Sequence, residues 1–215
     1  MTLYHKTAGM VLLDIHTHNL SADATTSILD NPTTDTARNI SVGIHPWKIG
    51  PDWEREFCEI EQAAICRNVA AIGECGIDRF KSPADIRLQE TVFRAHALLA
   101  EKVNKPIIIH CVKAYNEILS IHKDVSPEQP WIIHGYRGKP QQARQLVQAG
   151  MYLSFGEHFN AESARAIPTD RLFIESDEST LPIAEIYSRV AAAKGISIEE
   201  LAGQINSNAL IFGIF

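Results

Sequence analysis

Several features that define specialised protein classes are missing from this chain of 215 residues. No run of eighteen apolar residues occurs, so the sequence predicts no membrane-spanning helix. The first ten residues lack an apolar core followed by a small-residue cleavage site, and we therefore expect a cytoplasmic protein. The four cysteines, Cys58, Cys66, Cys75 and Cys111, show no C-x-x-C spacing, which in that compartment indicates reduced thiols.

An excess of positive charge is also missing. The formal net charge of -6 argues against broad, non-specific coating of duplex DNA, because that mode needs many Lys and Arg contacts to phosphate. A local cluster of basic residues around the entrance to an active site remains compatible with this charge. The length fits one domain over residues 1–215, which would bury roughly 70% of the surface of the extended chain. We expect this domain to act as a monomer.

Eight short apolar, β-branched segments recur along the chain, separated by polar or helical stretches. They are Val11–Ile15, Thr25–Leu29, Ile40–Ile44, Val69–Ile72, Pro106–Ile109, Trp131–Ile133, Met151–Ser154 and Leu172–Ile174. The isoleucines at 107–109 do not alternate with polar residues, which is typical of a parallel strand covered on both faces. The pattern predicts a TIM-like (β/α) barrel. Connections 17–24 and 30–39 leave little room for helices, so the first crossover segments should be shortened.

The helices are clearest in the middle of the chain. One should begin at Ser82 as the N-cap, with Pro83 at the first helical position. Its apolar stripe comprises Leu88, Val92, Ala95, Leu99 and Val103. Two further helices are predicted over residues 141–149 and 183–194, and each is followed by a glycine suited to a left-handed C-cap.

Histidines gather where the predicted strands end. Of the nine in the chain, five fall at or just past the C-terminal end of a strand: His16, His18, His45, His110 and His134. In a (β/α) barrel that rim carries the active site. Asp14, His16 and His18 are spaced two apart, so the period of a strand puts them on one face. Imidazoles spaced in this way can bind one metal ion together.

Two carboxylates should reach the same rim. Glu74 closes a predicted strand, and Asp177 follows the strand that ends near Glu175. Four imidazoles and two carboxylates exceed the needs of one tetrahedral ion, and a carboxylate can bridge two, so we expect two divalent ions. Glu175 is either a competing ligand or a carboxylate of the barrel wall. Nitrogen and oxygen donors together suit zinc, manganese, nickel or iron better than magnesium.

The remaining histidines have simpler interpretations. His96 lies within the apolar stripe of its helix and should be a hydrogen-bonded core residue. His5 and His122 are expected at the surface, and His158 in a solvated loop.

Taken together, these residues resemble those of the TatD-like metal-dependent hydrolases, usually described as deoxyribonucleases. The matching segments are Asp14-Ile15-His16-Thr17-His18, Gly43-Ile44-His45-Pro46, Gly73-Glu74-Cys75-Gly76-Ile77-Asp78, Ile109-His110, Ile133-His134-Gly135 with Gly138, Glu175-Ser176-Asp177 and the closing stretch from Asn206 to Gly213. They run in family order over nearly the whole chain. Val112 departs from the family, which usually has an arginine there.

The resemblance implies a role for each rim residue. His16 and His18 would bind one ion, His110 and His134 the other, with Glu74 bridging, Asp177 as ligand of the first ion and general base, and His45 near the substrate. The family is usually assayed with magnesium, so this ion joins the candidates.

A cationic two-ion centre suits an anionic phosphodiester, in nucleic acid or in a small molecule. Basic residues follow the predicted strands on the same rim: Lys48, Arg79, Lys81, Lys113, Arg137 and Lys139. Lys113 and Arg137, each three residues after a rim histidine, are the predicted substrate contacts. The alternatives are an amidohydrolase acting on a carboxylic amide or lactone, a phosphatase of the polymerase-and-histidinol-phosphatase family, and a non-enzymatic metal-binding or partner-binding module. Amidohydrolase sites often use a carboxylated lysine where this chain has Glu74.

Overall fold

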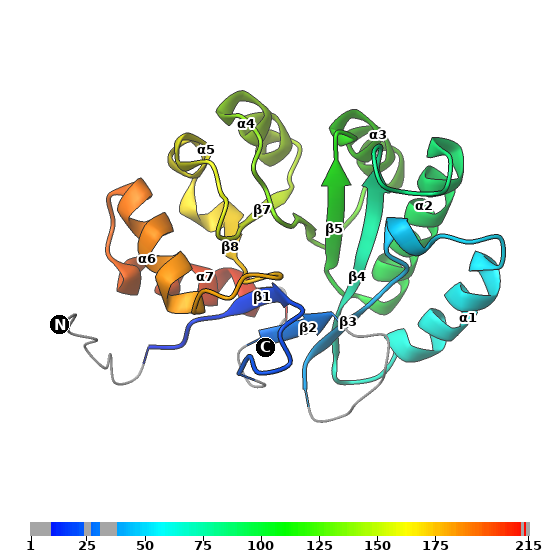
Figure 1. Ribbon diagram of the computed structural model, residues 1–215, viewed down its shortest axis with the longest axis horizontal. Helices are drawn as coiled ribbons and strands as arrows, with labels where there is room; N and C mark the ends of the chain where they lie inside the picture. Colours follow the sequence, from blue (N-terminus) through cyan, green and yellow to red (C-terminus); the bar gives the residue numbers. More distant parts are fainter. Residues whose placement is uncertain (1–9, 24–26, 31–37, 212, 214–215) are drawn as a thin grey trace.

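A computed structural model describes residues 10–23, 27–30, 38–211 and 213. Eight parallel strands form one sheet in sequential order, which confirms the predicted barrel (Figure 1). The strands are β1 (Asp14–Thr17), β2 (Ser27–Asp30), β3 (Ile40–Val42), β4 (Val69–Asp78), β5 (Ile107–Val112), β6 (Trp131–Ile133), β7 (Tyr152–Phe155) and β8 (Leu172–Ile174). Within the described residues, a single isolated bridge between Thr17 and Asp177 joins β1 to the segment after β8, so the barrel is nearly closed.

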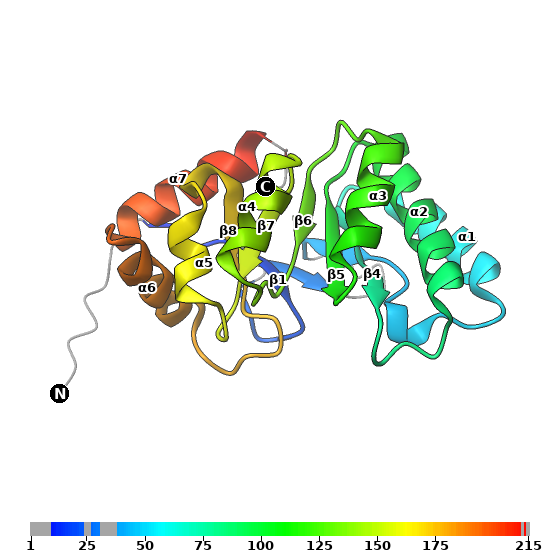
Figure 2. The ribbon, with the colours of Figure 1, turned by 90° about the horizontal axis from the view of Figure 1, so that it is seen from above.

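Helices follow the later strands and lie outside them, as the view from above also shows (Figure 2). They are α1 (Trp53–Ala64), α2 (Ile86–Val103), α3 (Tyr115–Val125), α4 (Pro140–Gln148), α5 (Ala161–Ala166), α6 (Ile183–Lys194) and α7 (Ile198–Ile211), with the short 3-10 helices η1 (Pro46–Lys48) and η2 (Thr169–Arg171). The described parts of the first two connections, residues 18–23 and 38–39, contain no helix. In Figure 1, β1 and β2 lie opposite the arc formed by α2 to α5. No helix of the described residues is both long and apolar enough to cross a membrane.

Burial explains the unbroken apolar runs. The side chains of Ile107, Ile108 and Ile109 are all fully buried, because one face of β5 packs inside the barrel and the other against helices. The expected left-handed C-cap also occurs at Gly195, which ends α6 with φ +71°.

Three predictions about local structure were wrong in position. The fourth strand, expected to end at Ile72 and to be closed by Glu74, continues to Asp78. The helix expected at Ser82 begins three residues later, where the side chain of Asp85 accepts a hydrogen bond from the Leu88 N–H. Ser82 instead donates its hydroxyl to the carbonyl of Pro46, 36 residues away. The first strand begins at Asp14 rather than Val11. The start of the second predicted strand, Thr25, lies outside the described residues, as does His5.

Strand β4 is the longest of the sheet and carries Glu74 in its middle. Gly73 and Gly76, on either side of Glu74, have φ of +131° and +147°. A Cβ atom at either position would collide with a carbonyl oxygen of β5, that of Ile108 or that of His110. The two glycines therefore let β4 approach β5 closely and place Glu74 at the mouth of the barrel.

Candidate metal centre

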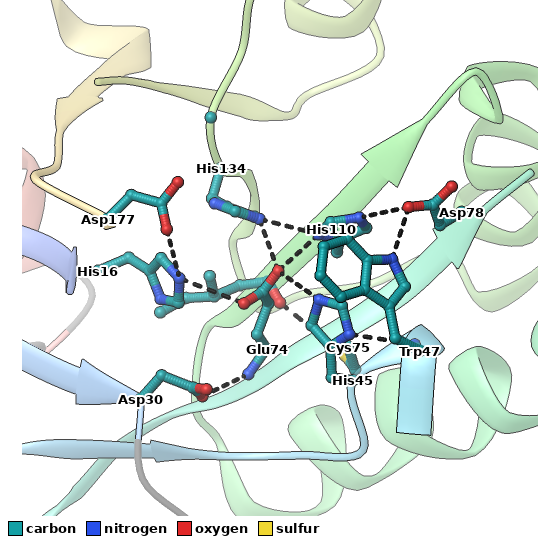
Figure 3. Close-up of polar contacts among 12 residues, drawn as sticks. His16, Asp30, His45, Trp47, Glu74, Cys75, Asp78, His110, His134 and Asp177 are labelled. Atoms are coloured by element: carbon teal, nitrogen blue, oxygen red, sulfur yellow. Dashed lines mark hydrogen bonds and ion pairs between the residues drawn. The ribbon is translucent and has the colours of Figure 1, made fainter. Parts of the chain in front are cut away.

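The carboxylate of Glu74 lies at the centre of a histidine cluster and is only 3% exposed. Its Oε1 atom is 2.6 Å from His110 Nδ1, 2.8 Å from His134 Nε2 and 3.1 Å from His45 Nε2. These histidines, here called the His110 group, come from the ends of β5, β6 and β3 and converge on one carboxylate oxygen (Figure 3). The distances are those of hydrogen bonds.

The other oxygen of Glu74 faces a second set of donors, the His16 group, consisting of His16, His18 and Asp177. Glu74 Oε2 lies 3.4 Å from His16 Nε2 and 3.5 Å from His18 Nε2. Asp177 Oδ1 lies 3.9 Å and 3.7 Å from the same two nitrogen atoms. One carboxylate therefore faces two adjoining donor groups through its two oxygens, which is the arrangement that a bridging ligand requires. The groups adjoin because donor atoms of His134, His16 and Asp177 also lie within 4.8 Å of one another.

The His16 group fits a divalent ion. Two donors bound at about 2.1 Å to one tetrahedral ion stand roughly 3.4 Å apart, close to the spacing seen here. Both ring nitrogens of His16 are buried and have no hydrogen-bond partner within the described part of the chain. The donor atoms of His16, His18 and Glu74, and those of His45, Glu74 and His110, each lie within 4.8 Å of one another. The residues present can hold metal ions on both sides of Glu74.

Backbone hydrogen bonds between β1 and the segment after β8 position the His16 group. The His18 N–H donates to the Asp177 carbonyl, and the Asp177 N–H donates to the His16 carbonyl, both at 3.0 Å. Asp14 shares a strand face with His16 but accepts hydrogen bonds from the backbone and hydroxyl of Ser176. Burial, only partly offset by these bonds, raises the pKa of Asp14 to about 6. Asp14 therefore ties β1 to the end of β8.

Glu175 lies behind His134. Its side chain is fully buried, accepts a hydrogen bond of 2.6 Å from the Gly135 N–H, and approaches His134 Nδ1 to 3.5 Å. A carboxylate on the far side of an imidazole orients the ring and favours donation from its other nitrogen. Of the two interpretations left open for Glu175, its contacts favour a carboxylate that positions His134.

Two aspartates of the site were missed by the sequence reasoning. Asp30, the last residue of β2, accepts a 3.0 Å hydrogen bond from the Glu74 N–H. Asp78, the last residue of β4, contacts His110 Nε2 at 3.2 Å. Both residues occupy strand ends, so the signal that singled out the histidines applies to them as well.

The charged groups of the cluster shift one another's pKa values. Burial alone would raise the pKa of Glu74, but His134, His110 and His16 hold it well below its usual value. Burial would likewise lower the pKa of His134, but Glu74 and Glu175 raise it well above the ordinary value. Burial and the nearby Glu175 carboxylate raise the pKa of Asp177. The carboxylate of Glu74 is thus held as an anion among imidazoles.

The centre opens into a cleft of about 1370 Å³. Five of the six basic residues predicted for the rim line it: Lys48, Lys81, Lys113, Arg137 and Lys139. The sixth, Arg79, forms an ion pair with Glu117 instead. The cleft therefore brings the candidate metal centre, His45 and both predicted substrate contacts together.

The described histidines outside the cluster differ in burial and in their contacts. His96 is a buried core residue, as expected: its Nε2 accepts from the Ile44 N–H and its Nδ1 donates to the Val92 carbonyl. His158 is exposed. His122, expected at the surface, is partly exposed there, while its ring also packs edge-on against buried Trp131 at 4.9 Å. All four cysteines are free.

The fold and the cluster define a metal-dependent hydrolase built on a (β/α) barrel. A family model described as "TatD related DNase" matches residues 17–212, so the chain belongs to this family, and the predicted resemblance is confirmed. An uncharacterized metal-dependent hydrolase of Bacillus subtilis strain 168, YabD, is 32% identical over 192 residues, 79% of this chain and 74% of that protein.

Other matches are more distant. A protein of Pantoea ananatis named "3'-5' ssDNA/RNA exonuclease TatD" is 26% identical over 202 residues, 81% of this chain and 77% of that protein. The crystal structure of YJJV, a TatD homologue from Escherichia coli K12, superposes with a TM-score of 0.75 at 19% identity. The superposition covers 86% of this chain and 85% of that one and shows the shared fold.

Proposed function

We propose that this hydrolase cleaves phosphodiester bonds, in nucleic acid or in small phosphodiesters, with two divalent ions held on either side of Glu74. The observation that carries the proposal is the position of Glu74. Its two oxygens face two donor groups at the floor of a cleft whose walls carry five cationic side chains. The exonuclease name of the Pantoea ananatis relative points to the same class of substrate.

In this proposal His16, His18 and Asp177 hold one ion, and His110 and His134 hold the other. Glu74 bridges the two. His45 reaches Glu74 and also lines the cleft, and we assign it to the substrate side of the centre. Bound divalent ions supply Lewis-acid activation of water and neutralise charge on a phosphoryl group.

The protein side chains contribute the remaining functions. Asp177 approaches both His16 and His18, and its side chain is 25% exposed, so it reaches the cleft and can accept the proton of the attacking water. Lys113 and Arg137 line the same cleft and are placed to orient an anionic substrate. Of the 20 Lys and Arg residues in the chain, five line this cleft, together with five carboxylates: Asp30, Glu74, Asp78, Asp177 and Glu178. This distribution favours a local contact with a few phosphates over a long duplex footprint.

A substrate panel tests the proposal. We expect the metal-loaded enzyme to hydrolyse a short single-stranded oligonucleotide and bis(p-nitrophenyl) phosphate, and to leave amides, lactones and phosphomonoesters largely intact. Elemental analysis of the same preparation should find two divalent ions per chain. Activity on amides or lactones with none on either phosphodiester would identify an amidohydrolase, and activity confined to phosphomonoesters would identify a phosphatase.

A further inference from the structure

Two large aromatic side chains are exposed in the cleft. Trp47 of η1 is 42% exposed and Phe80, in the loop after β4, is 73% exposed. Both line the cleft that contains Glu74. Scattered apolar side chains on a protein surface need no explanation, but two aromatic rings in the cleft of a candidate active site present an apolar surface to whatever enters it.

A single buried carboxylate holds this aromatic surface in place. Asp78 Oδ2 accepts a 2.7 Å hydrogen bond from Trp47 Nε1. Asp78 Oδ1 accepts hydrogen bonds from the backbone N–H groups of Phe80 and Lys81, at 2.8 Å and 3.0 Å. The indole ring and the loop of Phe80 are therefore fixed before a ligand binds, and less conformational entropy is lost on binding.

The fixed ring lies beside the candidate metal centre. The Trp47 ring centroid is 4.7 Å from that of His45 and 5.8 Å from that of His110, and Figure 3 shows the indole next to both. The Lys81 ammonium is 4.3 Å from the centroid of the Trp47 ring. A ligand that uses all of these features has a flat aromatic part joined to an anionic part close to the reacting bond.

We propose that Trp47 and Phe80 form a nucleobase-binding surface, on which the base next to the scissile phosphodiester stacks. The inference rests on the proposed phosphodiesterase function and specifies its substrate as a nucleotide-bearing chain with unpaired bases. In this arrangement Lys81 contacts the phosphate that follows the stacked base. Stacking on an aromatic ring tolerates any base, because every base has a π-face. It also supplies affinity that an acidic chain with few phosphate contacts would otherwise lack.

The test compares pentathymidylate with an analogue whose two terminal nucleotides lack their bases. In the wild type, removal of the bases should lower kcat/KM about fivefold to a hundredfold, the range found for single stacking contacts. Trp47→Ala should lose a similar factor on the intact oligomer and become insensitive to the missing bases. Trp47→Phe keeps an aromatic face but not the N–H donor to Asp78, and should retain most of the activity. Phe80→Ala should show a smaller loss.

A binding measurement gives a readout that is independent of turnover. Titration with a hydrolysis-resistant phosphorothioate pentathymidylate should quench part of the tryptophan fluorescence of the wild type. The quenching should disappear in Trp47→Phe and persist in the matched control Trp53→Phe, because Trp53 packs on Phe57 of α1 outside this cleft.

The outcomes separate the two proposals. Equal cleavage of the intact and base-free oligomers, without quenching, would overturn the base-binding surface and leave the phosphodiesterase intact. Equal losses in Trp47→Phe and Trp47→Ala on both oligomers would reduce Trp47 to a positioning residue for Asp78 and overturn the inference. A wild type that neither cleaves nor binds the oligomers would overturn the base-binding surface, and one that also leaves bis(p-nitrophenyl) phosphate intact would overturn both proposals.

Discussion

The two donor groups around Glu74 differ in what sets their positions. In the His16 group the histidine nitrogens lie 3.4 to 3.9 Å from the carboxylate oxygens of Glu74 and Asp177. The main chains of His16, His18 and Asp177 are joined by backbone hydrogen bonds between β1 and the segment after β8. In the His110 group the rings close onto one oxygen of Glu74 at 2.6 to 3.1 Å.

The His110 group combines backbone pairing, in which the His134 N–H donates to the Ile109 carbonyl at 3.1 Å, with supporting side chains. Asp78 contacts His110 from one side, and Glu175 approaches His134 from behind. Such outer contacts orient metal-binding imidazoles and tune their basicity. The His16 group is thus positioned across the closure of the barrel, and the His110 group by adjacent strands together with a side-chain network. Substitutions should therefore affect the two groups differently, and Glu74, which belongs to both, should have the largest effect.

Glu74→Ala should remove both ions and abolish hydrolysis, because both donor groups lose the carboxylate that they share. Elemental analysis should find less than one ion per chain, compared with two in the wild type. Glu162→Ala, which changes an exposed carboxylate on α5, is the matched control and should retain both ions.

Chelation of the wild type should abolish activity equally, with only a modest loss of thermal stability, because the apolar core of the barrel does not depend on the ions. An unfolded protein after chelation would assign the cluster a structural role, as in zinc fingers. Two retained ions in Glu74→Ala would rule out the bridge.

Asp177→Asn probes the His16 group alone. If Asp177 accepts the proton, kcat should fall by about 10² to 10⁴ while KM changes much less. Steady-state kinetics on bis(p-nitrophenyl) phosphate measure both constants. The control is Glu178→Gln, the neighbouring exposed carboxylate that lines the same cleft. Turnover near that of the wild type in Asp177→Asn would show that the base lies elsewhere.

The pH dependence of stability tests how His96 supports the backbone beside His45, a member of the His110 group. His96 accepts the Ile44 N–H directly before His45, and burial lowers its pKa from 6.5 to about 4. Between those values the unfolded state binds the extra proton, so the free energy of unfolding should fall as the pH drops from about 6.5 to about 4. The full loss is roughly 3 kcal/mol.

Urea unfolding at a series of pH values measures this slope. His96→Gln should flatten the dependence in that window, whereas His158→Gln, which alters an exposed loop histidine, should leave it unchanged. Identical slopes in His96→Gln and the wild type would show that other groups cause the acid sensitivity.

The smallest effects are expected at the cleft walls beyond β5 and β6. Lys113→Ala and Arg137→Ala should each raise KM for an oligonucleotide about fivefold and reduce the slope of log KM against log salt by about one unit. Saturated turnover should change less. Lys123→Ala, an exposed lysine of α3 outside the cleft, is the control. A salt slope that is unaltered in both cleft variants would show that neither residue contacts phosphate.

Much of this architecture could be predicted from local patterns. Apolar β-branched runs marked all eight strands, although β4 continues six residues past its predicted end, because a parallel strand buried on both faces leaves no polar alternation. Histidines and carboxylates placed directly after those runs had to reach one rim once the barrel formed. The ion-binding roles of His16, His18, Glu74, His110, His134 and Asp177 stay predictions.

Tertiary contacts were harder to foresee. Asp85 caps α2 because Ser82 donates its hydroxyl to the Pro46 carbonyl, a partner that local sequence does not reveal. His122 is half-buried because the ring of Trp131 lies beside it in the folded chain. In both cases a contact that forms only in the folded chain decides the outcome.

The amino-acid sequence alone determined which chemical groups reach the rim, since strand periodicity and strand ends are local properties. Only the tertiary structure decided which groups face each other. Glu74 meets histidines from four other strand ends, and Asp78 joins Trp47 to His110, because the register of β4 and the closure of the barrel bring them together. Which strand ends face each other across the barrel depends on the packing of the whole sheet, and no short segment encodes that packing.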